Sequence, residues 1–403
     1  MVPEGWTRHS LEDVAEIRTG LAKGKQYGDP IYMPYLRVAN VQDGYLDLSE
    51  IKQIAVGAEA VDRYLLRYGD VVLTEGGDFD KLGRGTLWRG EIPTCLHQNH
   101  VFAVRTKTDV LSPEFFAAQS GSPYGRRYFL SCAKRSTNLA SINSTQLKQF
   151  PVLLPPLPEQ KKIAEILSTW DAAIATTEKL LANAEAQKRA LMQQLLTGRR
   201  RLKGFGSDWV RVQIGSLLKE TRRAVDWSDD NLYSLLSLRR RSGGLFLRER
   251  LHGREILTKG MKTTKAGDFL ISKMQVVHGA MAMTPAKYDG MHISNSYISL
   301  IPRNKGQFEM RFFDWLSRMP FMYRLAYLSS YGVHIEKMTF NLDWFLQEKI
   351  VVPATAAEQS RIADILDAAQ YEVDTLSAVK AKILDEKRAL LQQLLTGKRR
   401  VTA

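Results

Sequence analysis

The sequence KRALMQQLLTGRRR, at Lys188–Arg201, returns as KRALLQQLLTGKRR at Lys387–Arg400. Twelve of the fourteen letters are identical, and the two copies lie 199 residues apart. The match extends backward without a gap, because EQKKIAEIL at Glu159–Leu167 corresponds to EQSRIADIL at Glu358–Leu366. The chain therefore carries one segment of about 40 residues twice, and an internal repeat of this size constrains the fold more than any local pattern.

Each copy of the repeat is predicted to form one long helix. Neither Pro nor Gly interrupts it before Gly198 or Gly397, where a left-handed C-cap favours glycine. Apolar side chains recur at alternating steps of three and four residues, a heptad seam that favours packing of two helices along their length. The basic residues after each glycine are expected to complement the negative end of the helix dipole.

Three lysines interrupt the predicted seam, namely Lys188, Lys380 and Lys387. A polar side chain at such a position fixes the register of paired helices at some cost in stability. We therefore expect these lysines to fix the register of the paired helices.

The segments ahead of the helices repeat more faintly. YGDVVL at Tyr68–Leu73 matches AGDFLI at Ala266–Ile271, and INSTQLKQFPVLLP at Ile142–Pro155 matches FNLDWFLQEKIVVP at Phe340–Pro353. Short β-branched runs between turn residues predict mixed α/β domains rich in strand. The predicted fold is α+β with a pseudo-twofold repeat: domains at 1–157 and 201–355, and long helices at 158–200 and 356–400.

The composition narrows the class of protein. The 403 residues include 57 Lys and Arg against 43 Asp and Glu, a net charge of +14 that favours a polyanionic partner. No apolar run is long enough to predict a membrane span. Cys95 and Cys132 are too few for a disulfide framework, and no Cys or His cluster has metal-ligand spacing. We predict reduced thiols and a cytoplasmic location.

In this order and number, the motifs resemble the specificity subunit of a type I restriction–modification system. In the first half they are PYLRVANVQDG (Pro34–Gly44), GDVVLTEGG (Gly69–Gly77), LPPLPEQKKIAEIL (Leu154–Leu167) and LLTGRRRL (Leu195–Leu202). The second half carries AGDFLISK (Ala266–Lys273), PATAAEQSRIADIL (Pro353–Leu366) and LLTGKRRV (Leu394–Val401). It departs from the pattern at YSLLSLRRRSGG (Tyr233–Gly244).

The resemblance implies two target-recognition domains separated by two helices that pair as an antiparallel coiled coil. It implies a non-catalytic subunit that binds double-stranded DNA and reads a bipartite target. Two modification subunits would dock on it and bind S-adenosylmethionine, so no cofactor is expected in this chain. A motor–nuclease subunit would join for cleavage.

Candidate DNA contacts are polar residues in the divergent loops, because Arg and Lys suit guanine while Asn and Gln suit adenine. Each has an ordinary alternative as a solvated side chain or a turn former. In the first domain they are Arg37, Asn40, Lys81, Arg84, His97, Gln98, Asn99, Lys134, Arg135 and Asn138. In the second domain they are Arg239, Arg240, Arg241, Lys273, Gln275, His278, Asn295 and His334.

Two other classes of protein, an enzyme and a protein-binding scaffold, are alternatives to a DNA-reading subunit. A self-contained methyltransferase or nuclease lacks support, since Asp29–Tyr32 is without the second proline of a base-gripping loop and Gly20–Gln26 is without Walker spacing. No catalytic, cofactor-binding or metal-binding residue is predicted. A coiled-coil scaffold with two protein-binding heads remains the alternative, and salt-sensitive binding to duplex DNA would distinguish the two.

Overall fold

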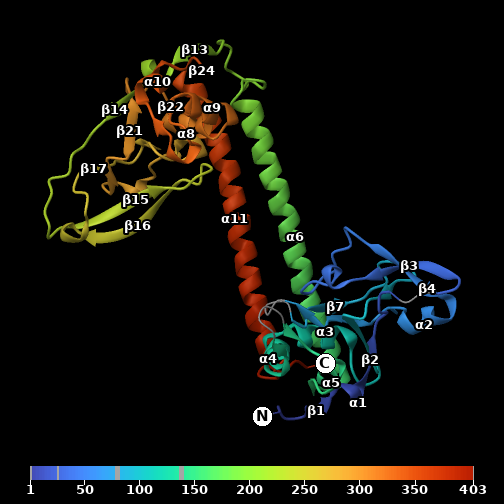
Figure 1. Ribbon diagram of the computed structural model, residues 1–403. Coiled ribbons are helices and arrows are strands. Elements are labelled where there is room, and N and C mark those ends of the chain that lie inside the picture. The colour runs from blue at the N-terminus through green and yellow to red at the C-terminus, as the bar shows by residue number, and fades with distance from the viewer. Residues whose placement is uncertain (1, 25–26, 78–81, 136–139, 403) are drawn as a thin grey trace. The chain divides into compact units, whose positions relative to one another are not determined.

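A computed structural model describes residues 2–24, 27–77, 82–135 and 140–402 of the chain (Figure 1). The fold divides into two compact units: Met1–Glu178 with Ala378–Ala403, and Lys179–Ser377. Each unit contains one predicted domain together with parts of both long helices. The predicted α+β class is confirmed.

The first domain is built on two small sheets. The first sheet is antiparallel, in the order β2 (Ala15–Thr19), β9 (Val101–Thr106), β5 (Val71–Thr74) and β7 (Gly85–Leu87). The second has the order β4 (Lys52–Gly57), β3 (Pro30–Leu36) and β8 (Leu96–His97), with β3 and β8 parallel. Strand β5 is buried on both faces, as expected of the apolar run VVLT.

Shorter elements complete this domain. Its helices are α1 (Leu11–Val14), α2 (Val61–Tyr64), α3 (Pro113–Gly121), α4 (Pro123–Cys132) and α5 (Ser144–Lys148). Strand β1 (Thr7–Ser10) pairs with β12 (Pro151–Leu154), and β11 (Ala140–Ser141) lies between β6 (Gly76–Gly77) and β10 (Lys134–Arg135). Ser112 and Ser122 cap α3 and α4, each of which has proline in its first turn.

The second domain repeats most of this topology, with a fourth strand, β17 (Met261–Thr263), in its second sheet and two strands in place of β6, β10 and β11. One sheet has the order β14 (Leu218–Thr221), β21 (Tyr297–Pro302), β18 (Phe269–Ser272) and β19 (Met281–Met283). The other has the order β16 (Leu245–His252), β15 (Leu232–Leu238), β20 (His292–Ser294) and β17 (Met261–Thr263). The helices are α7 (Ile214–Leu217), α8 (Met310–Ser317), α9 (Pro320–Leu328) and α10 (Leu342–Gln347). Strand β13 (Val210–Gln213) pairs with β24 (Lys349–Val352), and β22 (Ser330–Tyr331) with β23 (Thr339–Phe340).

The faint sequence matches fall on equivalent elements. YGDVVL and AGDFLI lead into the buried strands β5 and β18, while the second pair of matching segments forms α5–β12 and α10–β24. The divergent segment Tyr233–Gly244 forms β15 and its turn to β16, at the place that β3 takes in the first domain. Because the turn after β15 is much shorter than the β3–β4 loop, the two domains differ there while keeping most of one topology.

The long helices are α6 (Leu157–Leu195) and α11 (Ala356–Leu394), each of 39 residues. They end before the predicted positions 200 and 400 because Gly198 and Gly397 turn left-handed, at φ 71° and 68°. Arg200 N then donates to Gln194 O, and Arg399 N to Gln393 O, at 3.1 Å in both copies. Gly198 N also donates to Leu195 O at 3.4 Å, and Gly397 N to Leu394 O at 3.2 Å, so these turns end the helices at Leu195 and Leu394.

Within each unit, the segments of α6 and α11 run antiparallel, as predicted. In the first unit, Lys387 forms an ion pair with Asp171, and Lys380 Nζ lies 2.8 Å from Glu178 Oε1. In the second unit, Lys188 Nζ donates to Gln370 Oε1 at 2.9 Å. All three predicted seam lysines therefore contact the opposite helix. The repeat relates the Lys188–Gln370 pair to the Lys387–Asp171 pair.

The repeated Leu-Leu pair at the end of each helix belongs to a domain core. Leu195 and Leu196 pack in the core of the second unit with residues such as Phe312. Leu394 and Leu395 pack in the core of the first unit with residues such as Phe115. Each helix therefore starts against the domain that precedes it in the chain and ends in the core of the other domain.

The basic ending of each helix completes a polar junction, which consists of a Trp, a Glu and an Arg. In the first unit, Arg400 donates from Nε and Nη2 to the two carboxylate oxygens of Glu159 at 2.8 Å, and Trp6 Nε1 donates to Oε2 at 3.2 Å. The Glu159 side chain is only 5% exposed. The basic ending was predicted to act on its own helix dipole, whereas Arg400 binds the first turn of the other helix.

The second unit contains the same junction. Arg201 donates to Glu358 from Nε at 3.1 Å and from Nη2 at 3.2 Å, and Trp209 Nε1 donates to Glu358 Oε1 at 3.2 Å. The glutamine that follows each glutamate is also buried and hydrogen-bonded to backbone, Gln160 to Ser112 N and Gln359 to Glu309 N. The repeated EQ dipeptide is thus a structural motif.

Candidate nucleic-acid interface

A buried aspartate precedes the strand β5 or β18 in each domain and fixes the turn that leads into it. Asp70, fully buried, accepts hydrogen bonds from Arg105 Nε and Nη2 at 2.8 and 2.7 Å and from Arg67 N at 2.8 Å. In the second domain, Asp268 accepts from Arg223 Nη2 at 3.1 Å and from Lys265 N at 2.8 Å. The hydrogen bond that Arg105 donates to Asp70 is the main cause that raises the pKa of Arg105.

In the first domain, two loops that carry predicted residues meet beyond β5 and β8. Glu75 N donates to His100 O at 2.9 Å, and His100 Nδ1 lies 2.5 Å from Glu75 Oε2. Asn99 Nδ2 lies 3.4 Å from His100 Nε2. The partly exposed side chain of Gln98 lies in the same loop.

The remaining predicted residues of this domain are more scattered. Arg84 Nη1 donates to Gln42 Oε1 at 2.9 Å, which ties the loop before β7 to the β3–β4 loop. Lys134 is exposed on β10, the strand that also includes Arg135. Lys81 and Asn138 lie outside the described residues.

Two predicted DNA contacts in the first domain are buried within it. Asn40 is 3% exposed, and its side chain accepts from Arg37 N at 2.9 Å while donating to Asp47 O and Glu50 O. His97 is fully buried with Nδ1 2.7 Å from Val101 O, and its burial lowers its pKa. Both side chains hold the loop and strand in place and cannot reach a base edge.

Arg37 is also largely engaged within the protein. Its side chain is 16% exposed, and Nη2 donates to Glu50 O at 3.0 Å and to Glu50 Oε2 at 3.2 Å. The contact lowers the pKa of the exposed Glu50 carboxyl. Arg37 therefore supports the β3–β4 loop in this state.

In the second domain, three loops from distant parts of the sequence bring four side chains together. Arg240, in the β15–β16 turn, donates from Nε to Gln275 Oε1 and from Nη2 to Glu336 Oε2, both at 2.7 Å. His278 Nε2 lies 3.1 Å from Glu336 Oε1. We call Arg240, Gln275, His278 and Glu336 the Arg240 cluster. Three of its members were predicted, and Glu336 was missed because only basic and amide side chains were sought.

The other predicted residues of this domain surround the cluster or lie in adjoining loops. The guanidinium of Arg239 lies 4.3 Å from the Phe246 ring centre. Arg241, at φ 56°, donates its backbone N–H to His278 O at 2.6 Å, and Lys273 N donates to Ser296 O at 2.9 Å. Asn295 and His334 are exposed.

The loop that carries Glu336 and His334 also exposes apolar side chains. Val333 is 96% exposed and Ile335 is 50% exposed. At the base of this loop, the rings of Tyr331 and Trp344 meet edge to face, 6.0 Å apart. The Arg240 cluster and this loop together therefore combine cationic, amide and apolar groups, which are the kinds of group that read base edges and thymine methyls.

Reactive groups are not gathered in the described part of the chain. No three or more His, Cys, Asp or Glu side chains there are placed to hold a metal ion. Both cysteines are free, and burial raises the pKa of Cys95 to about 12, so this thiol is not poised as a nucleophile. No described helix is long and apolar enough to cross a membrane.

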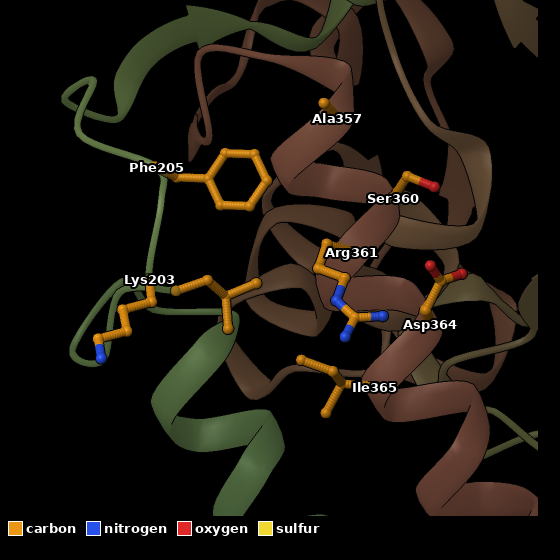
Figure 2. Close-up of a pocket in the computed structure, with 8 residues that line it drawn as sticks. Lys203, Phe205, Ala357, Ser360, Arg361, Asp364 and Ile365 are labelled. Carbon is orange, nitrogen blue, oxygen red and sulfur yellow. The ribbon is translucent and has the colours of Figure 1, made fainter.

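A groove of about 590 Å³ lies in the second unit, between the segment after α6 and the start of α11. Its lining residues are Leu202, Lys203, Phe205, Ala357, Ser360, Arg361, Asp364 and Ile365. Figure 2 shows the Phe205 ring turned toward α11 and the Lys203 side chain pointing away. Asp364 accepts from Arg311 Nη1 at 2.9 Å, so the groove offers no free acid–base pair and belongs to the helix junction.

Known proteins share both sequence and fold with this chain. A family model described as the type I restriction modification DNA specificity domain matches residues 3–186. A putative type I restriction enzyme MjaX specificity subunit of Methanocaldococcus jannaschii is 30% identical over 226 residues, 53% of either chain. The EcoKI specificity subunit of Escherichia coli K12 is 28% identical over 45% of this chain and 39% of its own. The matched regions thus span about half or less of these relatives.

Solved structures extend the likeness of fold to nearly the whole chain. The HsdS subunit from Thermoanaerobacter tengcongensis aligns with a TM-score of 0.52 and 17% identity over 99% of this chain and 98% of its own. The type I restriction–modification S subunit from M. genitalium aligns with a TM-score of 0.59 and 13% identity over 98% and 96%. At such identities the likeness shows a shared fold.

Proposed function

Because the chain is a relative of the specificity subunits of type I restriction–modification systems, we propose that it reads a DNA target in two parts, one half-site per domain. The observation that supports this proposal is the Arg240 cluster, in which three loops of the second domain bring together side chains of the kinds that read base edges. The first domain presents different side chains on a largely shared topology, at Glu75, Asn99 and His100. Two scaffolds of one kind with different loops suit a target whose halves differ in sequence.

The charge of the chain supports binding to duplex DNA. A net charge of +14 attracts phosphates without regard to sequence, while side chains at base edges supply the specificity. In this proposal the chain performs no chemistry itself. S-adenosylmethionine binding and adenine methylation belong to two modification subunits, and a motor–nuclease subunit joins for cleavage. The assembly would work in the cytoplasm.

The test is to sequence the methylome of a host that expresses the full chain with its modification subunit. We expect a split motif, modified on opposite strands and interrupted by an unread gap. A continuous motif would contradict the proposal that each domain reads one half-site. Exchanging the β15–β16 turn and the β22–β23 loop for those of another subunit should alter one half of the motif only.

Binding to random duplex DNA provides a second test. We expect the affinity of the full chain to fall linearly with salt concentration on a double-logarithmic plot, because bound phosphates release counterions. With six to ten phosphate contacts, the loss between 50 and 200 mM salt would be about 10³- to 10⁵-fold. A coiled-coil scaffold that binds only proteins would show almost no duplex binding at either salt concentration.

We further propose that the outward faces of the long helices dock the modification subunits. Leu180 is 50% exposed and Val379 is 41% exposed, and the 199-residue repeat places both at the same position of the two helices. An exposed apolar side chain at the same place in both copies suits two identical partners. The methyltransferase would then bind twice, once through each copy.

The prediction for this surface uses the double variant Leu180→Glu with Val379→Glu. We expect its affinity for the modification subunit to fall tenfold or more, roughly 1.4 kcal/mol, since each change places a charge in an apolar contact. Calorimetric titration with the cognate subunit measures this, and DNA affinity should be unchanged. Lys179→Glu, which introduces the same side chain one residue earlier, is the matched control. Equal affinities for wild type and double variant would show that the partner docks elsewhere.

A further inference from the structure

Two N–H donors of the Arg240 guanidinium are hydrogen-bonded within the protein, and its other N–H donors remain available. A guanidinium carries five N–H donors in one plane. Nε and one hydrogen of Nη2 are used, on Gln275 and Glu336, and the guanidinium donates no further hydrogen bond to a described residue. The side chain remains 50% exposed. The group therefore presents donors to solvent in an orientation that two neighbours have already fixed.

Glu336 is the unexpected member of this surface. Its side chain is 56% exposed, so burial does not fix its position. Its negative charge also opposes the approach of a DNA phosphate. One of its oxygens accepts from Arg240, and the other lies 3.1 Å from His278 Nε2. Its position is therefore explained by the groups that it holds. An arginine fixed in advance loses less conformational freedom when it binds.

The neighbouring arginines lack such a support in the described part of the chain. Arg239 lies over the Phe246 ring, 4.3 Å from its centre, and Arg241 contributes its backbone N–H to His278 O. Neither forms an ion pair with a described carboxylate. The two residues flanking Arg240 are thus matched comparisons of equal charge.

We propose that Arg240 reads a guanine in the half-site of the second domain, and that Gln275 and Glu336 are positioning residues that aim its guanidinium. This inference rests on the proposed function and assigns one base to one residue. Guanine presents two acceptors in the major groove, O6 and N7, at a spacing that a planar arginine fork matches. Adenine presents a donor in place of O6, so a fixed arginine rejects it.

The test uses the full chain in complex with its modification subunit and the duplex target found by methylome sequencing. Each guanine of the second half-site is replaced singly by 7-deazaguanine, which lacks the N7 acceptor, or by adenine. For the wild type, we expect one position at which adenine lowers affinity about tenfold to a hundredfold. Arg240→Ala should become indifferent to both replacements there. Arg240→Lys, which keeps the charge, should keep non-specific binding and lose most of that discrimination.

The positioning residues have their own readout. Glu336→Ala and Gln275→Ala should each weaken discrimination at the same guanine, by about threefold to tenfold, and should add little to Arg240→Ala. Arg239→Ala should weaken binding to all duplexes alike without altering the preference. If Glu336→Ala instead raised affinity for every duplex and kept the guanine preference, Glu336 would be only a repelling charge.

The failures of the two proposals are distinguishable. A wild type that prefers no sequence would overturn the proposed function. A wild type that reads a split motif, with Arg240→Ala keeping every preference, would overturn this inference alone. A second half-site without a guanine would do the same.

Discussion

Replacing Arg201 with alanine is expected to lower the free energy of unfolding of the second unit by about 3 kcal/mol, because removing one partner strands a buried charge. The Glu358 side chain is 2% exposed, and Arg201 is its two-point donor. Trp209 Nε1 would remain as a single donor at 3.2 Å. Native-state hydrogen exchange in urea, followed on amides of Lys179–Ser377, measures the change.

The control is the neighbouring residue. Arg200→Ala removes the same charge from an exposed side chain whose backbone, not its guanidinium, makes the cap. An exposed change of this kind should stay within about 0.5 kcal/mol of wild type. Equal losses for the two variants would mean that the junction contributes no more than net charge.

The equivalent junction of the first unit predicts a pH dependence. Burial raises the pKa of Glu159, but hydrogen bonds and charge from Arg400, with the Val401 and Trp6 donors, outweigh it and leave the pKa below 4.5. Glu159 therefore stabilises the fold above that pH, and the contribution is lost as the pH falls through its lowered pKa. In Arg400→Ala the effect of burial would be opposed only by the Val401 and Trp6 donors, so the pKa of Glu159 would be higher than in the wild type. The stability gap between the variant and wild type should then narrow in acid.

Taken together, the junctions explain why one basic ending occurs twice. The repeat was predicted to pair two helices, and it does so through Lys188, Lys380 and Lys387. Its last residues have a further role. The end of each helix packs in the core and the junction of the other domain, not of the domain that precedes the helix in the chain. The chain segment after Ala378 is thus part of the first unit. A change in one copy of the repeat should therefore affect the domain encoded in the other half of the sequence.

The helices were predictable because their signal is local and periodic. The junctions were not, although the glutamate and the arginine of each lie in the repeat. Trp6 is 153 positions from Glu159, which is 241 positions from Arg400, and only the antiparallel pairing brings the three together. The available signal was the matching trio of Trp209, Glu358 and Arg201, in which the arginine comes from the first copy of the repeat and the glutamate from the second. Sequence spacing alone does not show which arginine meets which glutamate.

The candidate interface was predictable in part. Arg240, Gln275 and His278 lie in turns at strand ends, where topology gathers loops, and the structure brings these three predicted residues together. Asn40 and His97 are of the right chemical type but point inward, where a polar side chain satisfies buried backbone groups. Composition cannot separate these two uses of one residue type. The burial of the side chain decides between them.

Replacing Asp70 with alanine is expected to cost the first unit about 4 kcal/mol of unfolding free energy, the largest single effect predicted here. The carboxylate is fully buried and accepts from two nitrogens of Arg105 and from Arg67 N. Alanine would leave the Arg105 guanidinium, 20% exposed, without its carboxylate and the turn before β5 without its hydrogen bond. Asp70→Asn, which keeps the shape and one acceptor, should lose less.

Asp43→Ala is the matched control, because Asp43 also pairs with an arginine, Arg126, but at the surface, where both side chains are about half exposed. Exposed pairs of this kind contribute at most about 1 kcal/mol. The sequence match of YGDVVL with AGDFLI further requires that Asp268→Ala destabilise the second unit as Asp70→Ala destabilises the first. Hydrogen exchange resolves the two units separately. Losses confined to one unit for each variant are expected, and a small effect of Asp70→Ala would show that the shared Gly-Asp turn is held by its backbone alone.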